Sequence, residues 1–241
     1  MRDSDILDIR MVKPPALQLR SLREQVYDYL REAINNGELS PGVFLDLNQI
    51  GDGLGISRTP LRDALLQLEI EGFVTILPRR GVVVNELTLE DIRHIYELVG
   101  ALEGAAVVSV ADRMGAREFG EMRNLNEEMA VAVEAGDFDT YYTRNLSFHG
   151  VFLDLSDNAS LTRTVEVLKH RLYDFPRRKS FVTAWEKASI GEHAAFLDLL
   201  EQGETRSAAD FLRDVHWSFK VQRSFILQYY FPDSAGSSKE S

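Results

Sequence analysis

The stretch GISRTPLRDALLQLEIEGFV, residues 55–74, decides the fold of the first part of the chain. Gly55 permits a tight turn between two helices. Ser57 or Thr59 caps the helix that follows, because either hydroxyl accepts a hydrogen bond from the backbone N–H groups of a first turn. Leucine and alanine then recur at helical spacing on one face, and Gly72 ends the helix. The stretch therefore predicts two helices that meet at a short turn.

The flanking residues predict that these helices belong to a small compact unit. Residues 21–36 carry apolar side chains on one helical face, and a short helix is expected from about 48 to 53. Further on, the apolar segments 73–77 and 82–84 flank the sequence Pro78-Arg79-Arg80-Gly81. This pattern predicts a β-hairpin with a basic tip. The predicted unit thus consists of three helices and a hairpin.

After Val84 the sequence pattern changes to long helices only. Thr88, with Asp91 three residues on, predicts a capping box at the start of the first of them. Further helices are expected at about 116–135, 138–155, 161–178, 185–202 and 206–229, between breaks marked by glycine, proline and short polar runs. We therefore predict two domains, residues 16–84 and residues 85–231.

The composition of the 241 residues limits the class of protein. A hydrophobic content of 44% is enough to bury a core in each of two modest domains. Cysteine is absent, which excludes disulfides, thiolate zinc sites and cysteine nucleophiles. Lys and Arg number 27 against 38 Asp and Glu, and the net charge of −11 argues against indiscriminate binding to nucleic acid or membranes. The acidity lies mainly in the second domain, since the residues up to Val84 hold ten basic and twelve acidic side chains.

No segment of the sequence predicts export or membrane insertion. Residues 1–13, MRDSDILDIRMVK, mix acids and bases without the apolar run of a signal peptide. No stretch approaches the roughly 18 consecutive apolar residues of a membrane span. We therefore expect a cytoplasmic protein with no membrane partner.

Arginines gather on the polar side of the predicted helix. Arg58 and Arg62 are four residues apart and project from one face, opposite the leucine stripe. A helix whose first turns carry arginines on the exposed face fits the major groove of DNA, where arginine hydrogen-bonds to guanine edges or to phosphates. Arg79 and Arg80, at the hairpin tip, are placed to reach a neighbouring groove or the backbone. Taken alone, these arginines are equally compatible with a solvated protein surface.

A dense pattern of matches runs through the first domain. It comprises Gly37, Leu39, Pro41-Gly42, Leu54-Gly55, Ser57-Arg58-Thr59-Pro60-Leu61-Arg62, Ala64-Leu65, Leu68, Glu71-Gly72 and the Arg-Gly wing tip. On these residues, the segment 22–84 resembles the winged helix-turn-helix of the GntR family of bacterial transcription regulators. The resemblance implies that double-stranded DNA is contacted by Ser57, Arg58, Thr59, Arg62, Arg79, Arg80 and Gly81. Asn48 stands where some relatives place a DNA-contacting arginine.

Three histidines in the second domain are candidates for a metal site. Asn145 and His149 lie four residues apart on one predicted helix, so their side chains point the same way. His193 and His216 each lie on another predicted helix among apolar neighbours. The three imidazoles can therefore converge inside a bundle, and neutral imidazole is a favoured ligand for Zn and Ni. A backbone carbonyl also satisfies a histidine on an apolar face, which leaves a purely structural role open.

The second domain carries landmarks of its own, namely Ile95-Tyr96-Glu97-Leu98, Ala101-Leu102-Glu103, Asn145-Leu146-Ser147-Phe148-His149, Asn158, Glu192-His193 and His216. On these residues, the segment 85–231 is similar to the all-helical FCD effector domain of the FadR subgroup. The resemblance implies one divalent metal, held by Asn145, His149, His193 and His216 at the base of an effector pocket. The first ligand is usually aspartate. Asparagine lowers the negative charge of the site, although its amide oxygen still coordinates.

A second departure from the family pattern concerns the effector. Many relatives carry an arginine at the position of Val99, where it pairs with a carboxylate effector, and valine cannot form that pair. Two explanations are open. Either the effector is not a simple organic acid, or another base, Arg144 or Arg171, binds it instead.

The sequence predicts a mainly α protein with an N-terminal winged helix-turn-helix, a small β-hairpin wing and a C-terminal all-α antiparallel helical bundle. The predicted function is that of a ligand-responsive DNA-binding regulator, in this family most often a repressor, that binds a near-palindromic operator as a homodimer. A zinc-dependent hydrolase is the main rival, but no HExxH pair, glycine-rich phosphate loop or GxSxG elbow is present. A third hypothesis makes the bundle a structural dimerisation domain without a ligand.

Overall fold

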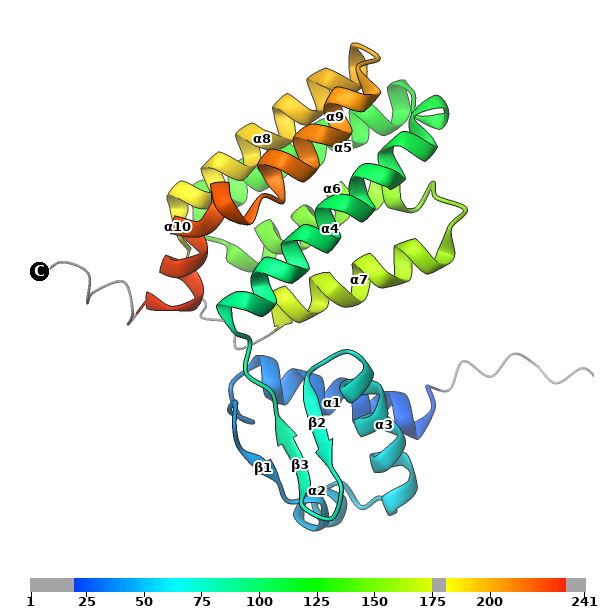
Figure 1. The fold of residues 1–241 in the computed structure, drawn as a ribbon, viewed down its shortest axis with the longest axis vertical. Helices are drawn as coiled ribbons and strands as arrows, with labels where there is room; N and C mark the ends of the chain where they lie inside the picture. Colours follow the sequence, from blue (N-terminus) through cyan, green and yellow to red (C-terminus); the bar gives the residue numbers. More distant parts are fainter. Residues whose placement is uncertain (1–19, 175–180, 233–241) are drawn as a thin grey trace, which may run out of the picture.

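The computed structural model describes residues 20–174 and 181–232 (Figure 1). A small winged domain lies at one end of the molecule and a larger helical domain at the other. This architecture confirms the predicted fold class. The predicted start of the first domain at residue 16 and the predicted helix end at residue 178 fall outside the described residues.

The winged domain consists of three helices and a three-stranded antiparallel sheet. Its elements are α1 (Leu22–Asn35), β1 (Phe44–Leu45), α2 (Leu47–Leu54), α3 (Arg58–Ile70), β2 (Val74–Leu77) and β3 (Gly81–Val84). The strand order is β1-β3-β2, and β2 and β3 form the predicted hairpin. The sequence did not reveal β1, because two residues are too few to show the alternation that marks a strand.

Local signals set the ends of these helices. Ser21 and Glu24 form a reciprocal capping box at the start of α1, and Asp46 accepts two backbone hydrogen bonds at the start of α2. Gly55 has a φ of 64°, a left-handed conformation that lets α2 turn directly into α3. The helix α3 then buries Leu61, Ala64, Leu65 and Leu68. Its opposite face is left on the surface of the domain.

The helical domain is a bundle around one central helix. Its helices are α4 (Leu89–Val110), α5 (Ala116–Ala135), α6 (Phe138–Leu153), α7 (Ala159–Asp174), α8 (Thr183–Glu201), α9 (Thr205–Phe211) and α10 (Phe219–Tyr230). The central helix α4 packs against α6, α7 and α9, while α5 packs against α6 and α8. The predicted starts of α5 to α8 lie within two residues of the observed ones.

The prediction of one continuous helix over residues 206–229 is wrong. After α9 the chain forms a π-helical segment, η2 (Leu212–His216), then breaks and resumes as α10. A π-helical turn holds one more residue than an α-helical turn, so it rotates the residues that follow. Leu212, Val215 and Phe219 keep helical spacing across the break, which hides it in the sequence.

The two domains pack directly on one another. The Asn85 amide donates to the Gly72 carbonyl at 2.9 Å and accepts from the Thr75 hydroxyl at 2.7 Å, which ties the connecting segment to the sheet. From α7, the Arg171 guanidinium donates to Asp91 at 3.1 Å. The same guanidinium covers Gly72, where a Cβ would come within 2.9 Å of Arg171 Nε. Helix α7 therefore contacts the winged domain while belonging to the bundle.

The central helix α4 has the length and apolar composition of a membrane span. Residues 89–113 are the one segment, within the described parts of the chain, that is long and apolar enough to cross a membrane. Half of its apolar window is buried inside the protein, and the segment contains the fully buried Glu103. These features are those of a core helix that carries a buried polar group.

Candidate functional site

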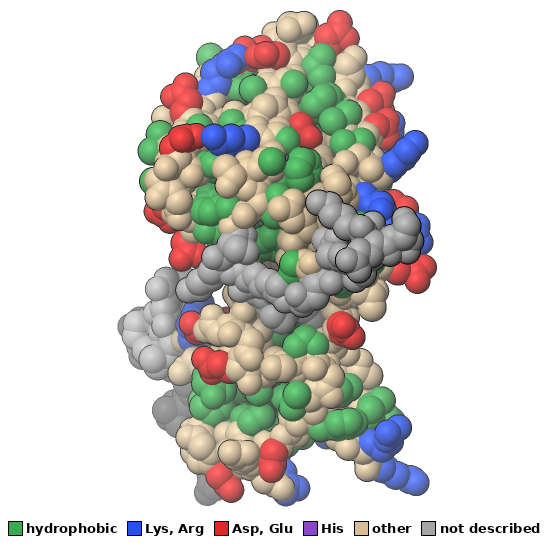
Figure 2. Space-filling view, turned by 90° about the vertical axis from the view of Figure 1, so that its left-hand side faces the viewer, with side chains coloured by type: hydrophobic (Ala, Val, Ile, Leu, Met, Phe, Trp, Pro, Cys, Tyr) green, Lys and Arg blue, Asp and Glu red, His purple; other side chains and the backbone are tan. Residues whose placement is uncertain are grey.

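The residues predicted to contact DNA gather at one end of the winged domain. Arg58 and Arg62 are exposed at the start of α3, and Arg79 and Arg80 are exposed at the wing tip. Figure 1 places the start of α3 and the β2–β3 turn at the same end, away from the helical domain. In Figure 2, basic side chains project from this lower edge of the molecule, with some acidic side chains nearby. The arrangement brings both arginine pairs to a single surface.

Polar side chains around the start of α3 orient this surface. Ser57 is the N-cap residue, yet its side chain makes no capping hydrogen bond, so its hydroxyl is free to bind phosphate. Thr59 is exposed beside it. The Arg58 guanidinium donates to the Asn48 amide oxygen at 3.1 Å. Asn48 therefore positions an arginine of α3.

The wing tip is a turn with two left-handed residues. Arg79 has a φ of 63° and Gly81 a φ of 116°. A residue other than glycine in this conformation is uncommon and indicates a tightly constrained turn. The Cβ that another residue would add at Gly81 would lie 3.5 Å from the Phe44 ring. The turn therefore fixes the wing tip with both of its arginines exposed.

Three histidines from separate elements meet inside the helical domain. His149 comes from α6, His193 from α8 and His216 from the end of η2. Each offers a ring nitrogen, and these three nitrogens lie within 4.8 Å of one another. The π-helical segment is the local feature that ends at His216, and it brings this ring to 4.8 Å from the His193 ring, centroid to centroid. We call these three residues the histidine cluster.

The Nδ1 atom of each histidine in the cluster already forms a hydrogen bond to another side chain. Nδ1 donates in each ring, from His149 to Glu103 at 2.9 Å, from His193 to Asn126 at 3.3 Å and from His216 to Glu192 at 2.8 Å. These bonds assign the proton to Nδ1 and leave Nε2 as a lone pair directed elsewhere. The Nε2 atoms of His149 and His193 are buried and have no hydrogen-bond partner. Metal-binding histidines have this pattern, with an acceptor behind each ring.

Asn145 supplies a fourth candidate ligand. It lies one turn before His149 on α6, is 6% exposed, and its amide donates to the Tyr173 hydroxyl at 3.4 Å. Its Oδ1 atom is buried without a partner. Three imidazole nitrogens and one amide oxygen match the donor set of a divalent transition metal. The unpaired buried atoms show that the residues present fit such an ion.

A buried carboxylate stands behind the cluster. Glu103, in the middle of α4, accepts hydrogen bonds from His149 and from the Trp217 indole at 2.7 Å, and pairs with Lys169 of α7. Glu103 has no exposed surface and Lys169 is 4% exposed. Burial alone would raise the pKa of Glu103, but His149 and Lys169 hold it well below its usual value. The role of Glu103 was not predicted from the sequence, although this charged residue lies on the same helix face as the buried Gly100 and Val107.

Burial keeps two histidines of the cluster neutral. It lowers the pKa of His149 to about 4, against the opposing influence of Glu103. It lowers the pKa of His193 well below the usual value, and the neighbouring His216 and His149 act in the same direction. Both rings are therefore uncharged at neutral pH, which is the state that a metal ligand requires.

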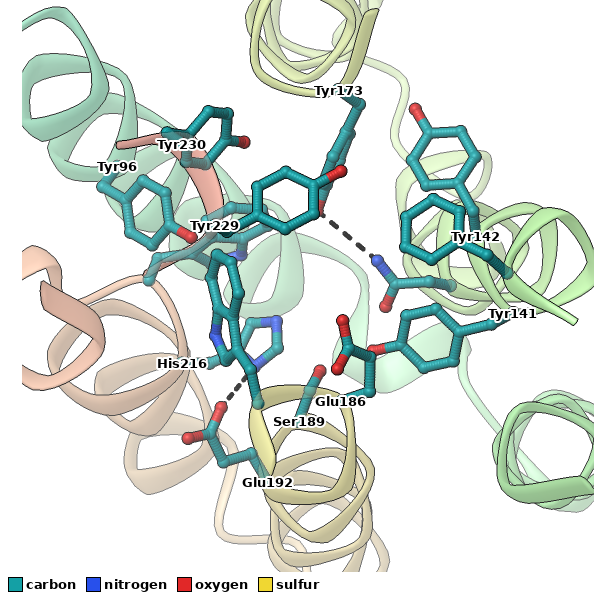
Figure 3. A pocket seen from close by; sticks show the side chains of 14 residues that line it. Tyr96, Tyr141, Tyr142, Tyr173, Glu186, Ser189, Glu192, His216, Tyr229 and Tyr230 are labelled. Carbon is teal, nitrogen blue, oxygen red and sulfur yellow. Dashed lines mark hydrogen bonds and ion pairs between the residues drawn. The ribbon is translucent and has the colours of Figure 1, made fainter. Parts of the chain in front are cut away.

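An aromatic cavity opens beside the cluster (Figure 3). Its volume is about 80 Å³, several times the roughly 10–15 Å³ that one water needs. Six of the eight tyrosines of the protein line it, namely Tyr96, Tyr141, Tyr142, Tyr173, Tyr229 and Tyr230. Asn145 and His216 also belong to its wall. The cavity therefore joins the candidate metal site to a chamber for a small molecule, which we call the tyrosine pocket.

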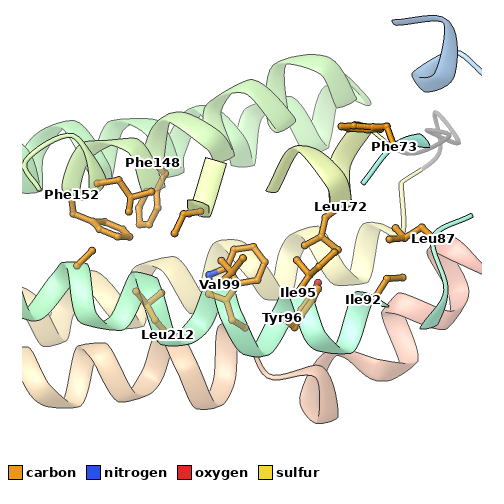
Figure 4. Packing of buried hydrophobic residues seen from close by; sticks show 14 of the residues in the cluster. Phe73, Leu87, Ile92, Ile95, Tyr96, Val99, Phe148, Phe152, Leu172 and Leu212 are labelled. Carbon is orange, nitrogen blue, oxygen red and sulfur yellow. The ribbon is translucent and has the colours of Figure 1, made fainter. Parts of the chain in front are cut away.

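The arginines that were predicted to replace the missing cation do not line the tyrosine pocket. Arg144 forms an ion pair with Glu128 at 2.5 Å, and Arg171 pairs with Asp91 at the domain junction. Val99 is fully buried in the core around α4 (Figure 4). This geometry gives no support to an effector-binding role for either arginine.

A second buried carboxylate lies in the wall of the tyrosine pocket. Glu186, in the first turn of α8, is 5% exposed, and its Oε2 atom has no hydrogen-bond partner. Figure 3 shows its carboxylate pointing toward the interior, near Tyr141 and Ser189. Burial raises the pKa of Glu186 to about 7. The burial of Glu186 could not be predicted from the sequence, because an acid in the first turn of a helix is ordinary.

Glu186→Gln is expected to stabilise the ligand-free protein at pH 8. Because the folded-state pKa of about 7 exceeds the usual 4.5, the contribution of Glu186 to stability is complete below pH 4.5 and is lost as the pH rises through 7. The glutamine variant should gain up to about 3 kcal/mol in free energy of unfolding at pH 8 and much less at pH 5. Urea unfolding at both pH values measures this. The exposed Glu127→Gln is the control, and equal effects of the two substitutions would contradict the prediction.

Comparisons with known proteins find a family model for each of two parts of the chain. Residues 22–84 match the model of bacterial regulatory proteins, gntR family, and residues 94–215 match the FCD domain. The uncharacterized HTH-type transcriptional regulator YdhC of Bacillus subtilis is 32% identical over 160 residues, 66% of this chain and 69% of its own length. The HTH-type transcriptional repressor RspR of Escherichia coli K12 is 24% identical over 148 residues, 61% of this chain and 65% of its own. The solved structure of E. coli McbR/YncC aligns with a TM-score of 0.62 at 23% identity, over 86% of this chain and 96% of that one.

The chain therefore belongs to the GntR family of bacterial transcription regulators and carries an FCD domain as its helical part. It is a transcription regulator of the GntR/FCD type, and its relatives are transcription regulators rather than enzymes. The likeness to McbR/YncC shows that the fold is shared. Regulators of the GntR family bind DNA, in agreement with the arginine surface of α3 and the wing.

Proposed function

We propose that this protein is an effector-responsive repressor of the FadR subgroup, which binds a near-palindromic operator as a homodimer in the cytoplasm. Its DNA-binding domain comprises residues 16–84 and its effector domain residues 85–231. One observation carries the proposal. The exposed pair Arg58 and Arg62 lies at the start of α3, in a domain whose family binds DNA.

The chemistry of the arginine surface supports operator binding. Two copies of α3, related by a two-fold axis, enter successive major grooves, where Arg58 and Arg62 bond base edges or phosphates. Contacts from the start of α3 and from the wing follow the DNA backbone and the neighbouring groove, through Ser57, Thr59, Arg79, Arg80 and Gly81. The net charge of −11 keeps the attraction to nonspecific DNA modest.

Arg62→Ala is expected to weaken operator binding by more than about 1 kcal/mol, because it removes a groove contact from the exposed face of α3. A gel-shift titration at fixed salt measures the change in affinity. Arg206→Ala on α9 removes the same charge from an exposed site in the helical domain and is the control. Unchanged affinity in Arg62→Ala would remove that residue from the interface.

Repression is supported by one relative, since RspR is named as a repressor. Control by an effector requires that the ligand bind one arrangement of the DNA-binding domains better than another. Helix α7 provides a physical connection for this control. Its Lys169 pairs with the buried Glu103 behind the histidine cluster, and two residues later Arg171 contacts the winged domain.

We further propose that the helical domain holds one divalent transition metal, such as Zn or Ni. The residues that would hold it are His149, His193, His216 and Asn145, whose unpaired buried atoms support the assignment. When bound, the metal would supply a Lewis acid at the base of the tyrosine pocket. The chain's own groups orient the ligands, since Glu103 fixes the ring of His149 from behind.

Two rival functions are weaker. A zinc hydrolase needs a base aimed at the reacting water, but Glu192, the nearest candidate, is engaged with His216 Nδ1. A purely structural bundle leaves the buried Nε2 atoms of His149 and His193 without a purpose. A stoichiometric transition metal in the purified protein argues against the structural role, and turnover of an ester or amide substrate would be needed to support the hydrolase.

A further inference from the structure

The charge of the tyrosine pocket is unusual for a chamber that receives an organic acid. The residues that line it include two with ionisable carboxyl groups, Glu186 and Glu192, and no lysine or arginine among the described parts of the chain. Lys169 is a buried cation on the same helix as the pocket residue Tyr173. Its ammonium lies over the Trp217 ring and is paired with Glu103. A carboxylate ligand away from the proposed metal would therefore meet the acid Glu186 and no lysine or arginine of the described residues.

Glu186 shows what kind of group is missing. Its Oε2 atom is buried inside a wall of aromatic rings and has no hydrogen-bond partner. A buried carboxylate without a partner is costly, and a positively charged donor beside it removes that cost. The Ser189 side chain belongs to the same wall. An ammonium group carries only donors, and it satisfies acceptors of this kind.

The aromatic walls favour the same class of ligand. Tyr142 and Tyr173 meet edge to face at 5.0 Å between ring centroids, and Trp185 meets Tyr229 in the same way at 5.9 Å. Such clusters present the negative faces of several rings to one space. Ammonium groups are attracted to these faces, while the rings accommodate an apolar body. The pocket thus combines ring faces with a buried acid.

We propose that the effector of this regulator is a small protonated amine with an apolar body, whose ammonium group binds at Glu186 among the tyrosines. This inference rests on the proposed function of the helical domain as an effector sensor. The volume of the pocket, about 80 Å³, suits a small ligand.

A metal ion in the histidine cluster would be separated from an ammonium group bound at Glu186. Glu186 and His193 lie on the same helix, and seven residues of α8 separate them by about 10 Å along its axis. Glu192 lies at the metal end, where its carboxylate accepts a hydrogen bond from His216 Nδ1. The ammonium therefore binds at the Glu186 end of the pocket, about two turns of α8 away from the metal end.

Isothermal titration calorimetry with the full-length, metal-loaded protein tests the proposal. The probes are n-butylamine, 1-butanol and butyrate, which share an apolar chain and differ in the charge of the head group. Each probe is titrated to a final concentration of about 20 mM. We expect n-butylamine to bind at least about tenfold more tightly than 1-butanol or butyrate. Butyrate binding as tightly as n-butylamine, or no binding by n-butylamine in this range, would overturn the proposal.

Substitution of Glu186 locates the binding. Glu186→Gln is expected to reduce the affinity for n-butylamine by about tenfold or more and to leave that for 1-butanol unchanged. Glu127→Gln on the surface of α5 should leave both unchanged. Thermal unfolding of both variants checks that they are folded. An unchanged affinity for n-butylamine in folded Glu186→Gln contradicts the assignment of the ammonium to this residue.

An operator titration in the presence and absence of n-butylamine separates this inference from the proposed function. A change in operator affinity supports both. Amine binding without such a change keeps the ammonium site and removes its effector role. Failure to bind any operator refutes the proposed function, whatever the calorimetry shows.

Discussion

Replacing Glu103 by leucine is expected to lower the free energy of unfolding by about 3–5 kcal/mol, because it leaves Lys169 charged and buried without its partner. The substitution also removes the acceptor of the His149 ring and of the Trp217 indole. Both donors then lie in the core without a hydrogen bond, which adds to the loss. Urea unfolding of the metal-free protein at pH 7 measures the change.

The matched control for this prediction removes both charges. In the double variant Glu103→Leu and Lys169→Met, no unpaired charge remains, so a large part of the lost stability should return. The Trp217 and His149 donors are unpaired in both variants, and the difference between them therefore isolates the cost of the lysine. A single variant as stable as the wild type would mean that Glu103 and Lys169 do not pair in the folded protein.

His149→Ala is expected to abolish metal binding, from about one divalent ion per chain in the wild type to none. The substitution removes one of the three imidazoles whose nitrogens lie within 4.8 Å of one another, and the remaining ligands cannot complete the site. Elemental analysis of the two purified proteins, after incubation with Zn or Ni and dialysis, measures the difference.

His94→Ala controls for the loss of a histidine as such, because His94 is exposed on α4 outside the histidine cluster. It should retain the metal of the wild type. A wild-type protein that remains metal-free after incubation would refute the metal site. In that outcome the neutral Asn145, in place of the usual aspartate, marks a site that no longer binds.

The helices of this protein could be predicted because their ends are encoded locally. The capping boxes at Ser21 and Thr88 and the left-handed Gly55 and Gly136 mark helix ends by residue type alone. The strand β1 could not be predicted, since it exists only through its pairing with β3. Its two residues carry no pattern of their own.

The candidate metal ligands could be predicted for a similar reason, whereas the pocket could not. Asn145 and His149 share a helix face by their spacing, and His193 and His216 each lie among apolar neighbours on another predicted helix. The tyrosine pocket is built from residues on several helices, so only the adjacent pairs, such as Tyr141 and Tyr142, hint at it in the sequence. Its character depends on which groups are buried, and that is decided by packing.

The predicted effector residues show the same limit. With valine at position 99, the sequence leaves open that Arg144 or Arg171 binds a carboxylate effector instead. In the fold, each is paired with an acid elsewhere, at Glu128 and Asp91. The sequence shows that a charged side chain is present, but the fold decides which oppositely charged side chain it pairs with.

The π-helical segment η2 makes the histidine cluster depend on chain length. Each residue advances an α-helix by about 100°, so deletion of one residue between Leu212 and Val215 would turn His216 by more than a quarter of a circle relative to α9. His149 and His193 would then lose their third neighbour, although every ligand residue would still be present in the sequence. Two chains with identical ligand residues can thus differ in metal binding because one of them is a single residue shorter in this segment.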